Sequence, residues 1–174
     1  AGADIKEDID DEAKVNKMKL FADLNDAVVQ FPKPHIAACH GYTVGGGAEI
    51  AVACDIRIGG SNLQMRFPGA ALGVPVGPAR LVTLCGLAHA KYLLLSSNTV
   101  KIDEALRIGL VNQAAPGAAT ENTALELAGR IAAHDPEGVA RLKRMLHEWD
   151  DIEGRSRTEG QGQVEWQRSG PGLH

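Results

Sequence analysis

The segment 42–55, which reads YTVGGGAEIAVACD, holds the residues best suited to chemistry. Gly45, Gly46 and Gly47 precede an alanine-rich stretch that we expect to be helical. Glycine lets a ligand approach the backbone closely, and the first turn of a helix offers unpaired N–H groups and a partial positive charge. The segment therefore suits an oxyanion. A plain tight turn between a strand and a helix is an equally good interpretation of the three glycines alone.

Two further features bear on this choice. A second turn of small residues runs from Ala1 to Asp4, and its amides could face the same point as those of the glycine run. Two amides that meet on one oxygen form an oxyanion hole, in which one donor lowers a reaction barrier by about 3 kcal/mol. Glu49 follows in the first turn of the expected helix. It is either an acid–base group or an acid that only favours the helix dipole.

The spacing of apolar residues predicts the elements that must position these groups. Helices are expected over 11–31, 48–54, 78–95 (with an interruption at Gly86) and 103–108, and strands over 35–40, 56–58, 63–67 and 110–115. Beyond Pro116 only helical patterns remain. Residues 155–174 are polar and glycine-rich, and we expect them to be loose or ordered only against a partner subunit.

Composition narrows the classes of function. The 174 residues suit one globular domain, and a net charge of −4 gives no general attraction to nucleic acid or to a membrane surface. The cysteines Cys39, Cys54 and Cys85 lack metal-site spacing and are expected to be reduced, which indicates the cytoplasm. We expect no metal and no apolar stretch that spans a bilayer.

Four blocks of sequence carry a resemblance to a known family. They are AGADIKE at 1–7, KPHIAACHGYTVGGGAEIAVACDIRI at 33–58, ALGVPVGPARL at 71–81 and DEALRIGLVNQ at 103–113. In their order and spacing they resemble the signature blocks of the crotonase, or enoyl-CoA hydratase/isomerase, superfamily. The resemblance extends to about residue 150. It implies an α/β spiral of ββα units whose first units are missing, over residues 1–116, and a helical trimerisation region over 117–174.

The resemblance also implies a site for an acyl-CoA thioester. Its oxyanion hole falls on the amides of Ala3 and Gly46, and Glu49 falls on the first of two glutamates that activate water in family hydratases. The remaining residues that would line the substrate are Ala1, Gly2, Asp4, Ile5, Lys6, Gly45 and Gly69. Coenzyme A is then part of the substrate, no bound cofactor is expected, and the partners are further copies of the chain in a homotrimer or hexamer.

One position departs from the family pattern. The second glutamate belongs directly after the proline at 68, where this chain has Gly69. Hydration needs one group to deprotonate water and one to deliver a proton to carbon, and a carboxylate pair supplies both. Gly69 either leaves room for a bulkier acyl group or admits a catalytic group from elsewhere, such as the absent N-terminal segment.

Three functions follow as hypotheses. The first is an enzyme of fatty-acid or related acyl-CoA metabolism that hydrates or isomerises an enoyl thioester with Glu49 as acid or base. The second is a CoA-thioester hydrolase or a carbon–carbon cleaving homologue that keeps the oxyanion hole. The third is an acyl-CoA binder without catalysis, which the glycine at 69 favours.

Several charged residues have simpler interpretations. His35 and His40 flank a buried strand and are expected to pack in the core, and Lys6 is either a coenzyme A ligand or a solvated lysine. Arg66 and Arg80 either bind an acyl carboxylate or have a salt-bridge or surface role. The basic helix face at Arg141, Lys143 and Arg144 is expected to face solvent.

Overall fold

The computed structural model describes residue 2, residue 4 and residues 6–172. The chain begins with helix α1 (Asp11–Val29), which Asp10 caps by accepting a hydrogen bond from the Ala13 amide. Strands β1 (Ile36–Cys39) and β2 (Tyr42–Val44) lead into helix α2 (Gly46–Ala53), and strands β3 (Ile56–Gly60) and β4 (Gln64–Arg66) follow. A 3-10 turn, η1 (Ala70–Leu72), then leads towards helix α3 (Pro78–Ser96).

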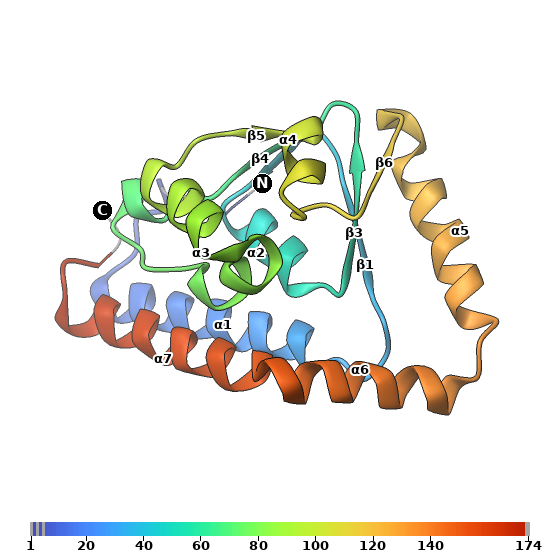
Figure 1. Ribbon diagram of the computed structural model, residues 1–174. Coiled ribbons are helices and arrows are strands. Elements are labelled where there is room, and N and C mark those ends of the chain that lie inside the picture. The colour runs from blue at the N-terminus through green and yellow to red at the C-terminus, as the bar shows by residue number, and fades with distance from the viewer. Residues whose placement is uncertain (1, 3, 5, 173–174) are drawn as a thin grey trace.

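The second half of the chain is mostly helical. Strand β5 (Val100–Lys101), helix α4 (Ile102–Arg107), strand β6 (Gln113–Ala115) and the 3-10 turn η2 (Gly117–Ala119) complete the part that carries the sheets. Helices α5 (Thr120–Ala132), α6 (Pro136–Asp150) and α7 (Ile152–Ser169) end it. In Figure 1, α5 lies beside strands β1, β3 and β6, α6 leads on from its far end, and α7 runs beside α1.

Two small sheets hold the strands. One has the order β1-β3-β6 with parallel pairing, and Ala38 lies opposite Ile58. The other has the order β2-β4-β5, in which β2 pairs with β4 in parallel and β4 pairs with β5 in antiparallel fashion. Because β1 and β2 are consecutive but belong to different sheets, the chain crosses from one sheet to the other just before the glycine run.

Helix α2 lies inside the molecule rather than on its surface. The core joins it to strand β4 and helix α3 through residues such as Met65, Phe67 and Leu81, each with 0% of its surface exposed. Ala48 and Val52 of α2 belong to the same core. An acidic side chain is rarely buried in a protein core unless it is paired. The one acidic residue of α2, Glu49, therefore needs a partner.

Most predicted elements are confirmed, with boundaries that shift by a few residues. Helix α3 contains the predicted interruption, since Gly86 has φ +76° and breaks the helical geometry. Strands β2 and β5 were missed, because segments of three and two residues give no readable alternation.

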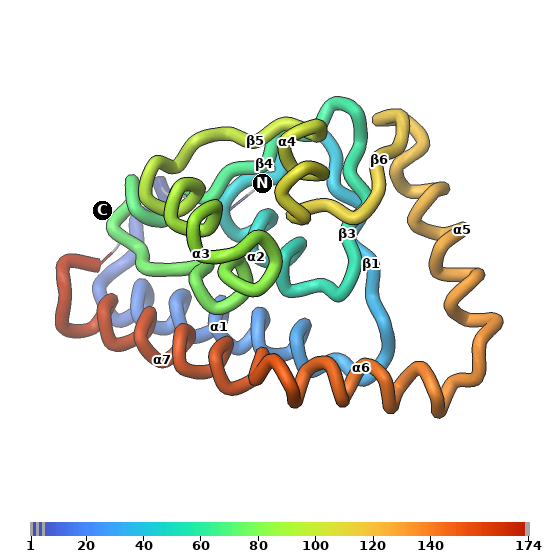
Figure 2. Tube along the Cα trace, in the orientation of Figure 1, coloured from blue at the N-terminus to red at the C-terminus, as the bar shows by residue number. Residues whose placement is uncertain are grey.

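The prediction for residues 155–174 was wrong as far as residue 169. Helix α7 packs along α1, and Ser156, which is 2% exposed, donates a hydrogen bond of 2.8 Å to Asp26 of α1. A Cβ added at Gly160 would lie 3.0 Å from Ala22 Cβ, so the two helices approach through small residues. The trace in Figure 2 follows this pairing along most of both helices.

We predict that substitution of Gly160 by valine lowers the free energy of unfolding by about 1–3 kcal/mol, because the new side chain presses α7 away from Ala22. Chemical denaturation monitored by circular dichroism measures the change. Gly162→Val is the matched control on the same helix, since a Cβ there meets no atom within 4 Å. Equal effects of the two substitutions would contradict close packing at Gly160.

Candidate active site

The glycine run makes the turn between β2 and α2. Gly45 has φ +56°, which favours glycine, and its amide donates to Arg66 O at 3.0 Å. The amide of Gly46, the first residue of α2, has no hydrogen-bond partner among the residues that the structure describes. This N–H group is therefore available to an acceptor, as expected for the first turn of a helix.

Gly2 lies against this turn. A Cβ added at Gly2 would lie 3.1 Å from the Gly46 nitrogen and 3.3 Å from Val44 O, so only glycine fits here without a shift. Ala3, whose amide is the expected second donor, lies outside the described residues, as do Ala1 and Ile5. The two predicted turns thus meet at Gly2 and Gly46, and the convergence of their amides on one oxygen stays a prediction.

Asp4 and Lys6 lie on the exposed part of the same segment. Asp4 Oδ1 accepts a hydrogen bond from the Lys6 amide at 2.9 Å, and Asp4 O accepts one from Lys17 Nζ at 3.1 Å. These contacts tie the segment to α1. Both residues remain exposed, so their assignment to substrate binding stays a prediction.

Glu49 is buried on α2 with only 1% of its surface exposed. Its Oε2 accepts a hydrogen bond of 2.9 Å from Arg80 Nη2. Its Oε1 has no hydrogen-bond partner within the described part of the chain. A Cβ added at Gly77 would lie 3.1 Å from Oε1, so this oxygen faces the backbone of a glycine.

Arg80 links Glu49 to the last helix. Its Nη2 also donates to Glu159 Oε1 at 2.6 Å, and Glu159 Oε2 accepts from the Ala79 amide at 2.7 Å. The side chain of Arg80 is 2% exposed and that of Glu159 is 8% exposed. Arg80 therefore forms salt bridges, which was one of its predicted roles. The sequence had not pointed to Glu159.

The environment changes the proton affinity of Glu49. Burial raises the pKa of this carboxyl to about 7; Arg80 opposes the rise, and the negative charge of Glu159 adds to it. Near neutral pH the group is thus divided between its acid and its carboxylate forms. A carboxyl in this state is suited both to accept and to deliver a proton.

The position of the absent second acid is closed. Gly69 O accepts hydrogen bonds from the amides of Leu72 at 3.1 Å and Val74 at 2.8 Å. A Cβ added at Gly69 would lie only 2.5 Å from Val74 O and 3.1 Å from Val76 Cγ1. Gly69 therefore leaves no gap for a bulkier acyl group at its own Cβ position, contrary to that alternative, because the loop folds back onto it.

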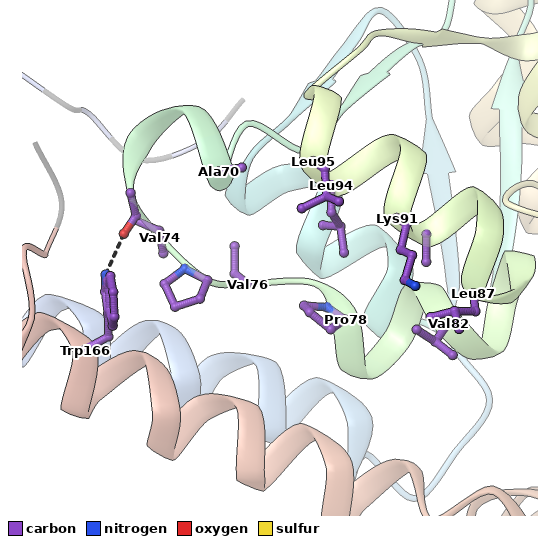
Figure 3. A pocket seen from close by; sticks show the side chains of 13 residues that line it. Ala70, Val74, Val76, Pro78, Val82, Leu87, Lys91, Leu94, Leu95 and Trp166 are labelled. Carbon is purple, nitrogen blue, oxygen red and sulfur yellow. Dashed lines mark hydrogen bonds between the residues drawn. The ribbon is translucent and has the colours of Figure 1, made fainter.

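An apolar cavity of about 490 Å³ lies beside this loop. Its walls come from the 70–78 loop, from α3 and from Trp166 of α7, whose Nε1 donates to Gly73 O at 2.8 Å (Figure 3). The lining residues include Ala70, Val76, Val82, Leu87, Leu94 and the charged Lys91. Such a cavity suits a hydrocarbon chain.

A second, partly buried ionic cluster surrounds Asp55, and the sequence did not predict this pairing. Asp55 Oδ2 accepts from Lys143 Nζ at 2.7 Å and lies 2.6 Å from His35 Nδ1, and His147 Nε2 lies 3.4 Å from Oδ1. Burial acts to raise the pKa of Asp55, but the hydrogen bonds from His35 and Lys143 outweigh it and lower the pKa to about 2. Lys143 is 8% exposed, so its predicted place on a solvated face was wrong.

The other predicted residues lie away from these contacts. Arg66 donates from Nε to Ser97 O at 2.7 Å, a structural bond. The three cysteines are free thiols, as expected. Within the described ranges every helix is too short or too polar to cross a bilayer, and His, Cys, Asp and Glu side chains there form no group of three suited to a metal ion.

Comparison with known proteins gives a consistent result. The family model for enoyl-CoA hydratase/isomerase matches residues 1–163. The short-chain-enoyl-CoA hydratase of Clostridium acetobutylicum is 39% identical over 154 residues, which cover 84% of this chain and 58% of that protein. The 2,3-dehydroadipyl-CoA hydratase of Escherichia coli is 32% identical over 162 residues, which cover 87% of this chain and 61% of that protein.

Solved structures agree. The structure of Pseudomonas aeruginosa DspI has a TM-score of 0.80 at 34% identity and covers 91% of this chain and 66% of that one. An enoyl-CoA hydratase from Bacillus anthracis has a TM-score of 0.82 at 28% identity, with 96% of this chain and 67% of that one covered. The chain thus spans about three fifths of the length of these curated relatives. On the family match, the identities and the shared crotonase fold, this chain belongs to the enoyl-CoA hydratase/isomerase family.

Proposed function

We propose that this chain acts on an acyl-CoA thioester by proton transfer at Glu49, with the thioester oxygen held by the amides of Ala3 and Gly46. The observation that supports this most is the buried Glu49 carboxyl, which has one oxygen on Arg80 and the other without a partner among the described residues. A buried polar atom without a partner costs stability. The presence of such an atom, Glu49 Oε1, in a packed core supports a role for this oxygen in contacting a substrate.

One carboxyl group is sufficient for the proton transfers of hydration and of a double-bond shift. In hydration, water oxygen bonds to the β-carbon of an enoyl thioester while Glu49 takes a proton from that water. The π electrons move towards the α-carbon and the thioester oxygen, where the two amides stabilise the enolate. Glu49 then returns its proton to the α-carbon, and the product has gained one molecule of water. A double-bond shift uses the same carboxyl to remove one carbon-bound proton and return it at another carbon.

Hydratase names among the relatives support hydration or isomerisation over cleavage of the thioester or of a carbon–carbon bond. The closed loop at Gly69 supports a second candidate, an acyl-CoA binder without catalysis, because no second acid reaches the site from that position. Product analysis by mass spectrometry separates these cases. Hydration adds one water, hydrolysis releases free CoA, and a pure binder converts nothing.

We expect Glu49→Gln to lower kcat by about 10²–10⁴-fold while acyl-CoA binding changes little, since the amide keeps the size of the side chain but cannot take a proton. Turnover of crotonyl-CoA and calorimetric binding of a saturated acyl-CoA are the two measurements. Glu104→Gln, at an exposed ion pair with Arg107, is the control and should leave both unchanged. Unchanged turnover in Glu49→Gln would exclude the role of this carboxyl.

We propose that the acyl chain lies in the apolar cavity beside the 70–78 loop. This loop lines the cavity and includes Gly77, whose backbone lies beside Glu49. Residues 1–116 then form the acyl-CoA-binding part. The helical part, 117–174, adds the wall that Trp166 provides.

Ala70→Phe should reduce kcat/KM for long-chain acyl-CoA by about tenfold or more and leave short-chain substrates nearly unaffected, since the ring would fill part of the cavity. A series of enoyl-CoA substrates of increasing length measures this. The neighbouring Ala71, which is exposed and does not line the cavity, gives the control Ala71→Phe. Equal loss for all chain lengths would place the acyl chain elsewhere.

We also propose a homotrimer, alone or paired into a hexamer. Support comes from α6, whose Leu142, Leu146 and Trp149 form an apolar stripe with 61%, 63% and 77% of their surfaces exposed. Such a stripe on a helix is typical of a surface buried between subunits.

Leu146→Asp should therefore shift the protein to a smaller species in light scattering coupled to size exclusion, because a charge would be buried at the interface. Glu148→Gln on the same helix, outside the stripe, is the control and should not change the mass. A wild-type monomer at micromolar concentration would contradict the proposed assembly.

A further inference from the structure

The two oxygens of the Glu49 carboxyl have different environments. Oε2 is fixed by Arg80 Nη2 at 2.9 Å, whereas Oε1 lies at the Gly77 backbone without a partner among the described residues. A carboxyl group rotates about its last bond, so a fixed contact at one oxygen decides where the other one points. Arg80 thus selects which oxygen is left for a substrate.

Arg80 is itself held from the other side. The same Nη2 atom donates to Glu159 Oε1 at 2.6 Å. Glu159 is anchored in turn by the Ala79 amide at 2.7 Å, and Gln163 Nε2 lies 3.3 Å from its Oε1. The position of the guanidinium therefore depends on α7, although Glu49 and Arg80 come from α2 and α3.

One guanidinium between two carboxyl groups leaves an excess of negative charge when both are ionised. Burial is the main reason that the pKa of Glu49 rises to about 7, and Arg80 and Glu159 act on that pKa in opposite directions. The charged groups that act on Glu49 are Arg80 from α3 and Glu159 from α7. Helix α1, which also packs against α2, brings the apolar Phe21 to its first turn.

We propose that Arg80 and Glu159 are positioning residues for Glu49: Arg80 directs Oε1 towards the substrate, and Glu159 holds Arg80 and competes for its charge. This rests on the proposed function, in which Glu49 transfers the proton. Its consequence is that the last helix takes part in the reaction through a contact that never touches the substrate. A purely structural salt bridge between α2, α3 and α7 is the alternative.

The pH dependence of kcat/KM separates the two roles. With Glu49 as the base, wild-type activity rises with pH through about 7 and then levels, because the carboxylate is the active form. Glu159→Gln removes a negative charge, so the midpoint of this rise should fall by about one unit. Arg80→Lys loses the shared guanidinium contact, so the midpoint should move upwards.

Ser156→Ala is the matched control. Ser156 lies on α7 and is buried, and its hydrogen bond to Asp26 holds the same helix without a charge near Glu49. This variant should lose stability and keep the wild-type midpoint. If Arg80 and Glu159 only held the helices together and did not act on the Glu49 carboxyl, all three variants would lose folded protein and every midpoint would stay in place, and that result would overturn the proposal.

A second measurement is independent of turnover. In protein with ¹³C-labelled glutamate, the carboxyl resonance of Glu49, assigned by its loss in Glu49→Gln, gives the titration midpoint directly. A lower midpoint in Glu159→Gln and a higher midpoint in Arg80→Lys support the proposal even if no acyl-CoA is converted. Lack of conversion would overturn only the proposed function. Unmoved midpoints in folded variants overturn the proposal even where Glu49 is needed for turnover.

Discussion

A carboxyl group inside a packed core needs a positive charge beside it, and in this molecule a single guanidinium meets that need for two carboxyl groups. Arg80 bonds to Glu49 and Glu159 through one nitrogen, and each of these three side chains comes from a different helix. Removal of one partner from such a buried group leaves an uncompensated charge, which costs several kcal/mol. The placement of α2, α3 and α7 around the site therefore depends on this contact.

The loop between Gly69 and Gly77 links this ionic contact to the apolar cavity. At one end it closes over Gly69, and at the other it brings the Gly77 backbone to Glu49 Oε1. Between them Gly73 accepts the bond from Trp166, so the loop is fastened to α7 in the middle. The ionic contact and the apolar cavity thus share one piece of backbone and one supporting helix.

Much of this arrangement could be predicted from the sequence, because it rests on local patterns. The glycine run before an alanine-rich stretch predicted the turn at Gly46, and the glycine at 86 predicted the interruption of α3. Helix α7 was not, because its burial comes from glycine and serine against α1 rather than from an apolar stripe. Lys143 was misplaced for a related reason, since its partner Asp55 is 88 positions away.

The distance along the chain between the partners has a consequence for biogenesis. Glu159 is 79 positions beyond Arg80, and the Ser156 contact to Asp26 spans 130 positions. While the protein emerges from the ribosome, α1, α2 and α3 exist for some time without the helix that covers them. A nascent chain that ends before α7 contains Glu49 and its counter-ion Arg80, but it lacks Glu159 and the residue that covers Ala22, Gly160. The final docking of α7 closes long loops, so it is expected to be a late step in folding.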